Sequence, residues 1–143
     1  MIKCHSWARV LVVSSLCLSV VTGCGNGVSK AQEEVMITTN VTPSLGLVRN
    51  ARVRITNNRI PVLDVTAELG LTGTVALTYP ASSPGPLMVE VMGDDDAEYF
   101  DESTAGFVPF PATASIRAVL PEPEEAVGVT ALTEVAAARF EAQ

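Results

Sequence analysis

The chain has 143 residues, a net charge of −7 and a hydrophobic fraction of 48%. This acidic balance argues against binding of nucleic acid and against attraction to anionic membrane surfaces, since both carry negative charge. The only histidine is His5, and the three cysteines are Cys4, Cys17 and Cys24. Removal of residues 1–23 would therefore exclude the common zinc sites and the Ser–His and Cys–His nucleophile pairs from the rest of the chain.

The N-terminal segment has the pattern of a secretory signal. Lys3 and Arg9 provide positive charge, and a largely apolar run of 12 residues follows at 10–21. A run of this length is typical of a signal peptide, whereas a stable helix across a hydrocarbon core of about 30 Å needs about 20 residues. We therefore predict that residues 1–23 are a signal peptide.

The apolar run ends in Val21-Thr22-Gly23-Cys24. This order of an aliphatic, a small polar and a small residue before cysteine resembles the lipobox of bacterial lipoproteins. The resemblance implies cleavage before Cys24, lipid attached to its sulfur, and, from Gly25, sorting to the outer membrane where a cell has two. Two or more acyl chains hold a protein stably, since each buried methylene contributes about 0.8 kcal/mol. The alternatives are an ordinary cleaved signal with an incidental Cys24, and a permanent N-terminal anchor helix.

The predicted mature part, residues 24–143, has seven basic and 16 acidic residues, which give it a net charge of −9. Residues 24–34 are expected to be a lipidated, flexible tether because small residues begin the segment, and the remaining length is enough for one domain. An arginine cluster comprises Arg49, Arg52, Arg54 and Arg59. Residues 60–116 contain nine carboxylates and no Lys or Arg. The arginines are expected to face these carboxylates across a sheet; the alternative is a basic binding face.

From about Val35 the sequence has the period of two that is typical of β-strands. Alternating apolar residues predict strands at 51–55, 63–69, 75–79, 87–92, 116–120 and 127–129. Asn57-Asn58 predicts a tight hairpin turn, because Asn tolerates positive φ. One-sided alternation and the Pro- and Gly-rich turns between short strands indicate an all-β fold, an antiparallel β-sandwich over residues 35–130.

The C-terminal segment changes to the period of a helix. Thr130 is expected to cap a helix over 131–143, because its hydroxyl can accept a backbone N–H of the first turn. The helix would carry an apolar stripe on one face, formed by Leu132, Val135, Ala136 and Phe140. Either this stripe packs on the sandwich, or the chain is the N-terminal part of a longer protein.

Three later segments, 99–104, 116–121 and 129–136, follow one another in a familiar order, and Ala51-x-Val53-x-Ile55 precedes them. Together they resemble the transthyretin-like or carboxypeptidase-regulatory-like modules of exported bacterial proteins. The resemblance covers about two-thirds of the mature chain and implies an Ig-like sandwich without a catalytic signature. It places a glycine soon after Thr104, and here glycine comes one position late, in Ala105-Gly106.

The segment 93–102 is dense in oxygen ligands. Its candidate calcium ligands are Asp94, Asp96, Glu98 and Asp101. The spacing differs from that of an EF-hand, because counting from Asp94 puts Tyr99 where Gly is needed and Ala105 where Glu is needed. A solvated acidic turn and an acidic contact surface are the other interpretations.

Two further features near this segment have simple interpretations. Asp101 with Glu102 or Glu98 could serve as the acid and base of a glycosidase. Adjacent residues on a strand point to opposite faces, however, which argues against this interpretation. Four aromatic residues, Tyr99, Phe100, Phe107 and Phe110, are expected to pack in the core and at its edge.

The sequence thus predicts a lipid-anchored cell-envelope protein that presents a non-catalytic β-sandwich for structural or adhesive contacts. Its partners would be the membrane, through Cys24, and an envelope or extracellular protein or glycan, with no nucleic acid and no cofactor. Whether it faces the periplasm or the surface is left open. The alternative is a calcium-stabilised or glycan-binding surface domain.

Overall fold

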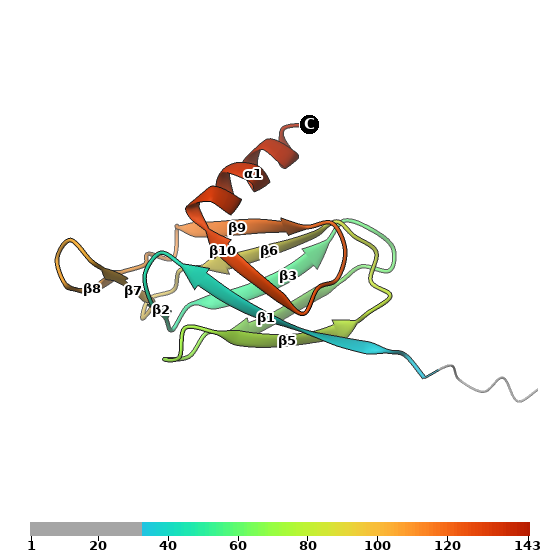
Figure 1. Cartoon of the computed structure of the whole chain (residues 1–143), viewed down its shortest axis with the longest axis horizontal. Helices are drawn as coiled ribbons and strands as arrows, with labels where there is room; N and C mark the ends of the chain where they lie inside the picture. Colours follow the sequence, from blue (N-terminus) through green and yellow to red (C-terminus); the bar gives the residue numbers. More distant parts are fainter. Residues whose placement is uncertain (1–32) are drawn as a thin grey trace, which may run out of the picture. The chain divides into compact units, whose positions relative to one another are not determined.

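The computed structural model describes residues 33–143, which belong to one compact unit. The predicted signal peptide 1–23, the lipid attachment at Cys24 and most of the predicted tether 24–34 lie outside the described residues. Within 33–143 the chain forms ten strands and one C-terminal helix (Figure 1). The elements are β1 (Met36–Ser44), β2 (Val48–Arg49), β3 (Arg52–Asn57), β4 (Asp64–Glu68), β5 (Val75–Pro80), β6 (Leu87–Met92), β7 (Glu98–Asp101), β8 (Gly106–Pro109), β9 (Ser115–Leu120), β10 (Ala126–Thr130) and α1 (Ala131–Glu141). The prediction of an all-β fold with a short C-terminal helix is confirmed.

The strands form three sheets. A three-stranded sheet has the order β10-β1-β5, and a four-stranded sheet has the order β4-β3-β6-β9. These two sheets lie one over the other with the core between them (Figure 1). A small third sheet, β2-β7-β8, lies at one end.

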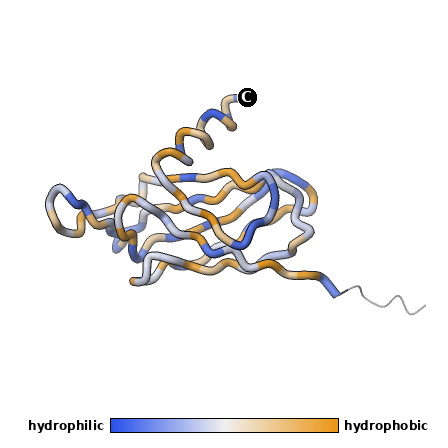
Figure 2. The backbone as a smooth tube through the Cα atoms, in the orientation of Figure 1, coloured by the Kyte–Doolittle hydropathy of each residue, from blue (hydrophilic) through white to orange (hydrophobic). Residues whose placement is uncertain are grey.

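The core is formed by the inward side of each alternating strand. Val53, for example, is paired with Val91 of β6 and Ala67 of β4. Figure 2 shows hydrophobic residues recurring along the strands of both larger sheets. One buried polar pair is satisfied internally, because Thr39 Oγ1 lies 2.7 Å from Tyr79 Oη and both side chains are fully buried. Each fully buried Val or Leu contributes about 1.5–3 kcal/mol to folding.

The expectation of purely antiparallel pairing is wrong at one place. β1 pairs antiparallel with β5 but parallel with β10, with Val41 opposite Val127. The cause is the segment 121–125, which carries the chain from the four-stranded sheet to the three-stranded one. β10 therefore runs beside β1 in the same direction. Alternation within a strand does not encode this pairing.

The predicted tight turn at Asn57-Asn58 is also wrong. Asn57 is the last residue of β3, and a longer loop connects it to β4. Its side chain is buried and holds the loop in place, an arrangement that we call the Asn57 scaffold. Nδ2 donates to the carbonyls of Pro61 (3.3 Å) and Pro84 (3.1 Å), and Oδ1 accepts from the Leu63 N–H (2.7 Å). These bonds close the loop without a positive φ at either asparagine.

The acidic segment contains a hairpin that periodicity did not predict. β7 pairs with β8 from Glu98↔Pro109 to Asp101↔Gly106. Its turn places Ala105 at φ 50°, a left-handed conformation that favours glycine. This is the position at which the resemblance to transthyretin-like modules places a glycine.

The predicted cap of α1 is confirmed. Thr130 Oγ1 accepts from the Thr133 N–H at 3.1 Å, and Thr133 Oγ1 accepts from the Thr130 N–H at 2.8 Å. The apolar stripe, in contrast, does not pack on the sandwich: all four of its residues, Leu132, Val135, Ala136 and Phe140, are exposed. The helix packs on β9 and β10 through the opposite side, where Ala137 is fully buried.

Candidate functional site

The outer face of the four-stranded sheet is a surface of paired charges. From β3, Arg54 makes a bidentate pair with Asp64 of β4, with N···O distances of 2.9 and 2.7 Å. Arg52 pairs with Asp94 just beyond β6 at 2.5 Å. Opposite charges on neighbouring strands stabilise their pairing by a few tenths of a kcal/mol to about 1 kcal/mol.

The small sheet repeats this arrangement with an aromatic neighbour. Arg49 binds Glu98 across β2 and β7 at 2.6 Å, and its guanidinium lies 3.6 Å from the centroid of the Phe107 ring. Phe107 in turn packs edge to face with Phe100, at 5.5 Å between centroids. Three of the four clustered arginines therefore face carboxylates, as expected from the sequence.

The other two aromatic residues of this region mark the edge of the core. Phe110 is buried, and Tyr99 packs against it edge to face at 6.4 Å between centroids. The interpretation as core and edge packing is thereby confirmed for Phe110 and Tyr99, whereas Phe100 and Phe107 are half-buried in the small sheet, against each other and Arg49.

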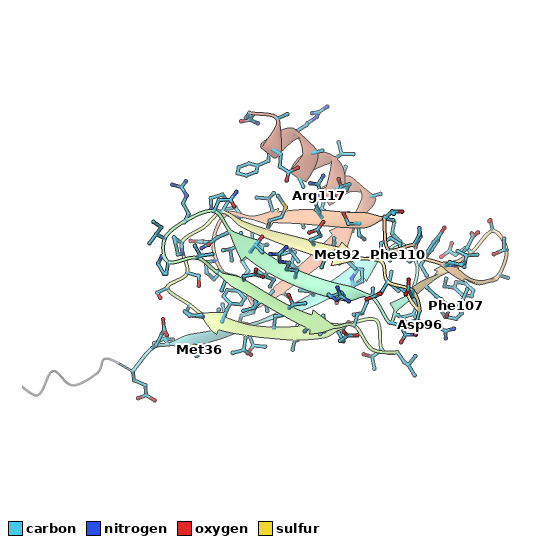
Figure 3. All side chains as sticks on the ribbon, turned by 180° about the vertical axis from the view of Figure 1, so that it is seen from behind. Met36, Met92, Asp96, Phe107, Phe110 and Arg117 are labelled. Carbon is cyan, nitrogen blue, oxygen red and sulfur yellow. The ribbon has the colours of Figure 1, made fainter. Side chains whose placement is uncertain are left out.

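Arg117 of β9 forms a clamp on helix α1 (Figure 3). Its guanidinium donates to the Glu134 carboxylate from Nη2 at 2.6 Å and from Nε, which is shared between both carboxylate oxygens at 3.1 and 3.3 Å. Its Nη1 donates to Glu141 at 2.5 Å. The hydrogen bonds from Arg117 hold the pKa of Glu134 below its ordinary value, and the same pairs raise the pKa of Arg117. The clamp explains why α1 presents Glu134 and Glu141 to the sheet, whereas Leu132, Val135 and Ala136 of the apolar stripe are exposed to solvent. Phe140, the last residue of the stripe, is partly exposed beside the sheet.

A groove of about 710 Å³ lies between the C-terminal half of α1 and the outer face of the sheet. Its lining combines apolar side chains (Met88, Val119, Phe140) with charged ones (Arg59, Glu90, Glu141). Its volume is in the range of small-ligand sites. Because residues 33–143 contain no His or Cys, the groove offers apolar and ionic contacts but no imidazole or thiol chemistry.

A second hollow, of about 820 Å³, lies beside the acidic segment. Asp94, Asp96 and Glu98 line it, and Asp101 does not. Asp94 and Glu98 are each paired with an arginine.

Asp101 is engaged within its own turn. Its Oδ1 accepts from the N–H and the hydroxyl of Ser103 at 2.8 and 2.7 Å, which lowers the pKa of Asp101. Among residues 33–143 no group of three or more acidic, His or Cys side chains is arranged to hold a metal ion. The structure therefore does not bring the four candidate calcium ligands together.

No protein-family model, no curated protein and no solved structure matches this chain. The lipobox and the resemblance to transthyretin-like modules thus stay predictions from the sequence. Over residues 33–143, α1 is the only helix, and it lacks the length and apolar character that a membrane crossing requires.

The sequence did not predict two structural features, the Arg117 clamp and the Asn57 scaffold. The seven-residue spacing of Glu134 and Glu141 places both carboxylates on one face of a helix, and this spacing was the available signal for the clamp. Nothing in the local sequence distinguishes the buried Asn57 from its exposed neighbour Asn58.

Proposed function

We propose that this protein is a lipid-anchored component of the bacterial cell envelope, which presents a non-catalytic β-sandwich domain for structural or adhesive contacts. The observation that carries the proposal is Val21-Thr22-Gly23-Cys24, placed after a positive segment and an apolar run of 12 residues. A folded strand begins at Met36, only 12 positions after the cysteine. This order of signal, cysteine, short connection and domain suits a protein held close to a membrane.

Two observations support a role in contacts over a role in catalysis. The chain after Cys24 contains no His and no further Cys, which removes the side chains most used as bases and nucleophiles. In residues 33–143, moreover, the arginines at 49, 52, 54 and 117 are engaged in structural ion pairs. The two hollows beside α1 and the acidic segment are the contact surfaces that we propose.

The test is fractionation of cells that express the full chain or a Cys→Ser variant. Wild type is expected in the membrane fraction, and Cys24→Ser is expected to lose membrane association because no lipid can attach. Cys17→Ser is the matched control, since it changes a cysteine inside the apolar run, and it should fractionate as wild type does. Recovery of Cys24→Ser with membranes to the same extent as wild type would contradict the proposal.

Protease treatment of intact cells then decides which face presents the domain. Digestion of the wild type would place it on the cell surface, as adhesive contacts with external partners require. Protection until the envelope is opened would remove the adhesive part of the proposal and leave a structural role inside the envelope.

A further inference from the structure

The loop between β3 and β4 carries an exposed apolar tip, Ile60-Pro61-Val62. The Ile60 side chain is 92% exposed and that of Val62 is 75% exposed. Single exposed hydrophobic residues are ordinary on protein surfaces. Here, however, three consecutive apolar residues are exposed together at the end of a loop.

The apolar tip is held outward by the Asn57 scaffold. The three side-chain hydrogen bonds of Asn57 are joined by a fourth bond, in which its backbone N–H donates to the Leu63 carbonyl at 3.2 Å. The loop is thus closed at its base, and Leu63 itself is buried in the core. Ile60 and Val62 are held outside the core, because Asn57 and Leu63 at the base of the loop are both buried and hydrogen-bonded to each other.

The tip lies at the end of the domain where the chain enters β1. The Val35 carbonyl accepts from the Ala81 N–H at 2.8 Å, and the loop that begins at Ala81 reaches Asn57, which donates to the Pro84 carbonyl. Figure 1 shows β1 beginning and β3 ending at this same end, and Figure 3 shows Met36 there with Phe107 at the other. Val35 and Met36 are also exposed, so apolar surface surrounds the point where the chain enters the domain.

We propose that this end of the domain rests on the bilayer that holds Cys24, with Ile60 and Val62 inserted into its interface. The inference rests on the proposed lipid anchor. Eleven residues from Gly25 to Val35 separate the anchor from the domain, and a chain of that length spans at most about 40 Å. This length keeps the domain near the membrane, and the end that carries the tip is the end at which the connection from Cys24 enters the domain.

The charged residues at this end of the domain indicate which lipid headgroups it can approach. Five exposed carboxylates belong to the segments beside the tip and the start of β1: Glu33, Glu34, Glu122, Glu124 and Glu125. Arg59 is the one basic residue next to the tip. Anionic headgroups would repel this surface, so the partner is a bilayer with zwitterionic headgroups.

The test places a tryptophan at the tip of the full-length lipoprotein. Trp7 is the only tryptophan and lies in the predicted signal peptide, so Ile60→Trp would give the mature protein a single tryptophan. The protein is purified from membranes in detergent and reconstituted into phosphatidylcholine vesicles with brominated acyl chains. Leu71→Trp is the matched control, because Leu71 is 69% exposed in the loop between β4 and β5, at the opposite end of the sandwich.

We expect the tryptophan emission of the Ile60→Trp variant to move to shorter wavelength and to be quenched by the brominated lipid, while that of the Leu71→Trp variant stays water-like. Replacing half of the phosphatidylcholine by phosphatidylglycerol should reduce the quenching in the Ile60→Trp variant, and added salt should restore it.

Each contrary result is assigned to one part of the proposal. Water-like emission from the Ile60→Trp variant, in vesicles that carry the protein, would overturn the membrane contact and leave the anchor intact. Failure of the purified protein to float with the vesicles would overturn the anchor, and the contact with it. Val62→Trp repeats the test at a second position of the tip.

Discussion

Ala105 shows how a single residue can work against the local backbone of this fold. It closes the β7–β8 hairpin at φ 50°, whereas Gly106, its neighbour in β8, does not have a positive φ. The left-handed conformation costs a residue with a Cβ about 1–2 kcal/mol. The turn would therefore be more favourable with glycine at position 105, where φ is positive, than at position 106.

We expect Ala105→Gly to stabilise the protein by about 0.5–1 kcal/mol, since relief of the left-handed strain is partly offset by the larger unfolded-state entropy of glycine. Gly106→Ala is the control: the nearest atom to its added Cβ would be the Thr104 carbonyl oxygen, at 3.9 Å. Its free energy of unfolding should change by no more than about 0.5 kcal/mol. Urea unfolding measures both variants, and a loss of stability in Ala105→Gly would contradict the account of this turn.

At the scale of elements, the positions of β3, β4, β5, β6, β9 and β10 follow from sequence because they depend on local alternation, whereas β1 and the short strands β2, β7 and β8 were not predicted as strands. Val53 and Ile55 are buried and Arg52 and Arg54 point outward, as the period of two predicts. The direction of β10 and the orientation of α1 were beyond such reasoning, because they depend on contacts between distant segments. The hydrogen bonds from Arg117 in β9 to Glu134, 17 residues later in the sequence, determine which face of α1 packs on the sheet.

The candidate site was predictable to the same extent. The pairing of the arginine cluster with carboxylates followed from charge distribution, because strands bring opposite charges together. The calcium ligands were predicted from the density of acidic residues alone. This density does not show that Arg49 and Arg52, from distant segments, pair with Glu98 and Asp94. The groove beside α1 could not be predicted, since it exists only where the clamp sets the helix.

We expect the attachment of α1 to weaken in acid. The hydrogen bonds from Arg117 lower the pKa of Glu134 in the folded protein, so the unfolded state binds this proton more readily. The stabilisation is present above the ordinary glutamate value of 4.5 and is lost as pH falls below it through the lowered pKa. Asp64 and Asp101, whose pKa values are also lowered, contribute stability of the same sign.

The measurement is urea unfolding at a series of pH values for wild type, Glu134→Gln and Glu122→Gln. Glu134→Gln should be less stable than wild type at neutral pH, by about 1–2 kcal/mol, because charged hydrogen bonds are replaced. The difference should shrink as the pH falls. Glu122 is exposed in the loop before β10, and its variant should follow the wild-type curve. A pH-independent difference between Glu134→Gln and wild type would contradict the clamp.

At the scale of the whole molecule, the two ends of the sandwich differ in chemistry. The end where the chain enters carries the apolar tip, and the other end carries the small sheet and the acidic hollow. In our proposal, the first end faces the membrane, and partners bind the acidic hollow at the second end or the groove between α1 and the sheet. The net charge of −9 after residue 23 suits this arrangement, because it disfavours adsorption of the flanks to anionic lipid and keeps the outer end free.

The central claim is the lipid on Cys24, and mass spectrometry of the protein purified from membranes tests it most directly. We predict an N-terminal peptide that begins at Cys24 and is heavier than its sequence by the mass of attached acyl chains. An N-terminal peptide that begins elsewhere, or one that begins at Cys24 with a free thiol, would contradict the account.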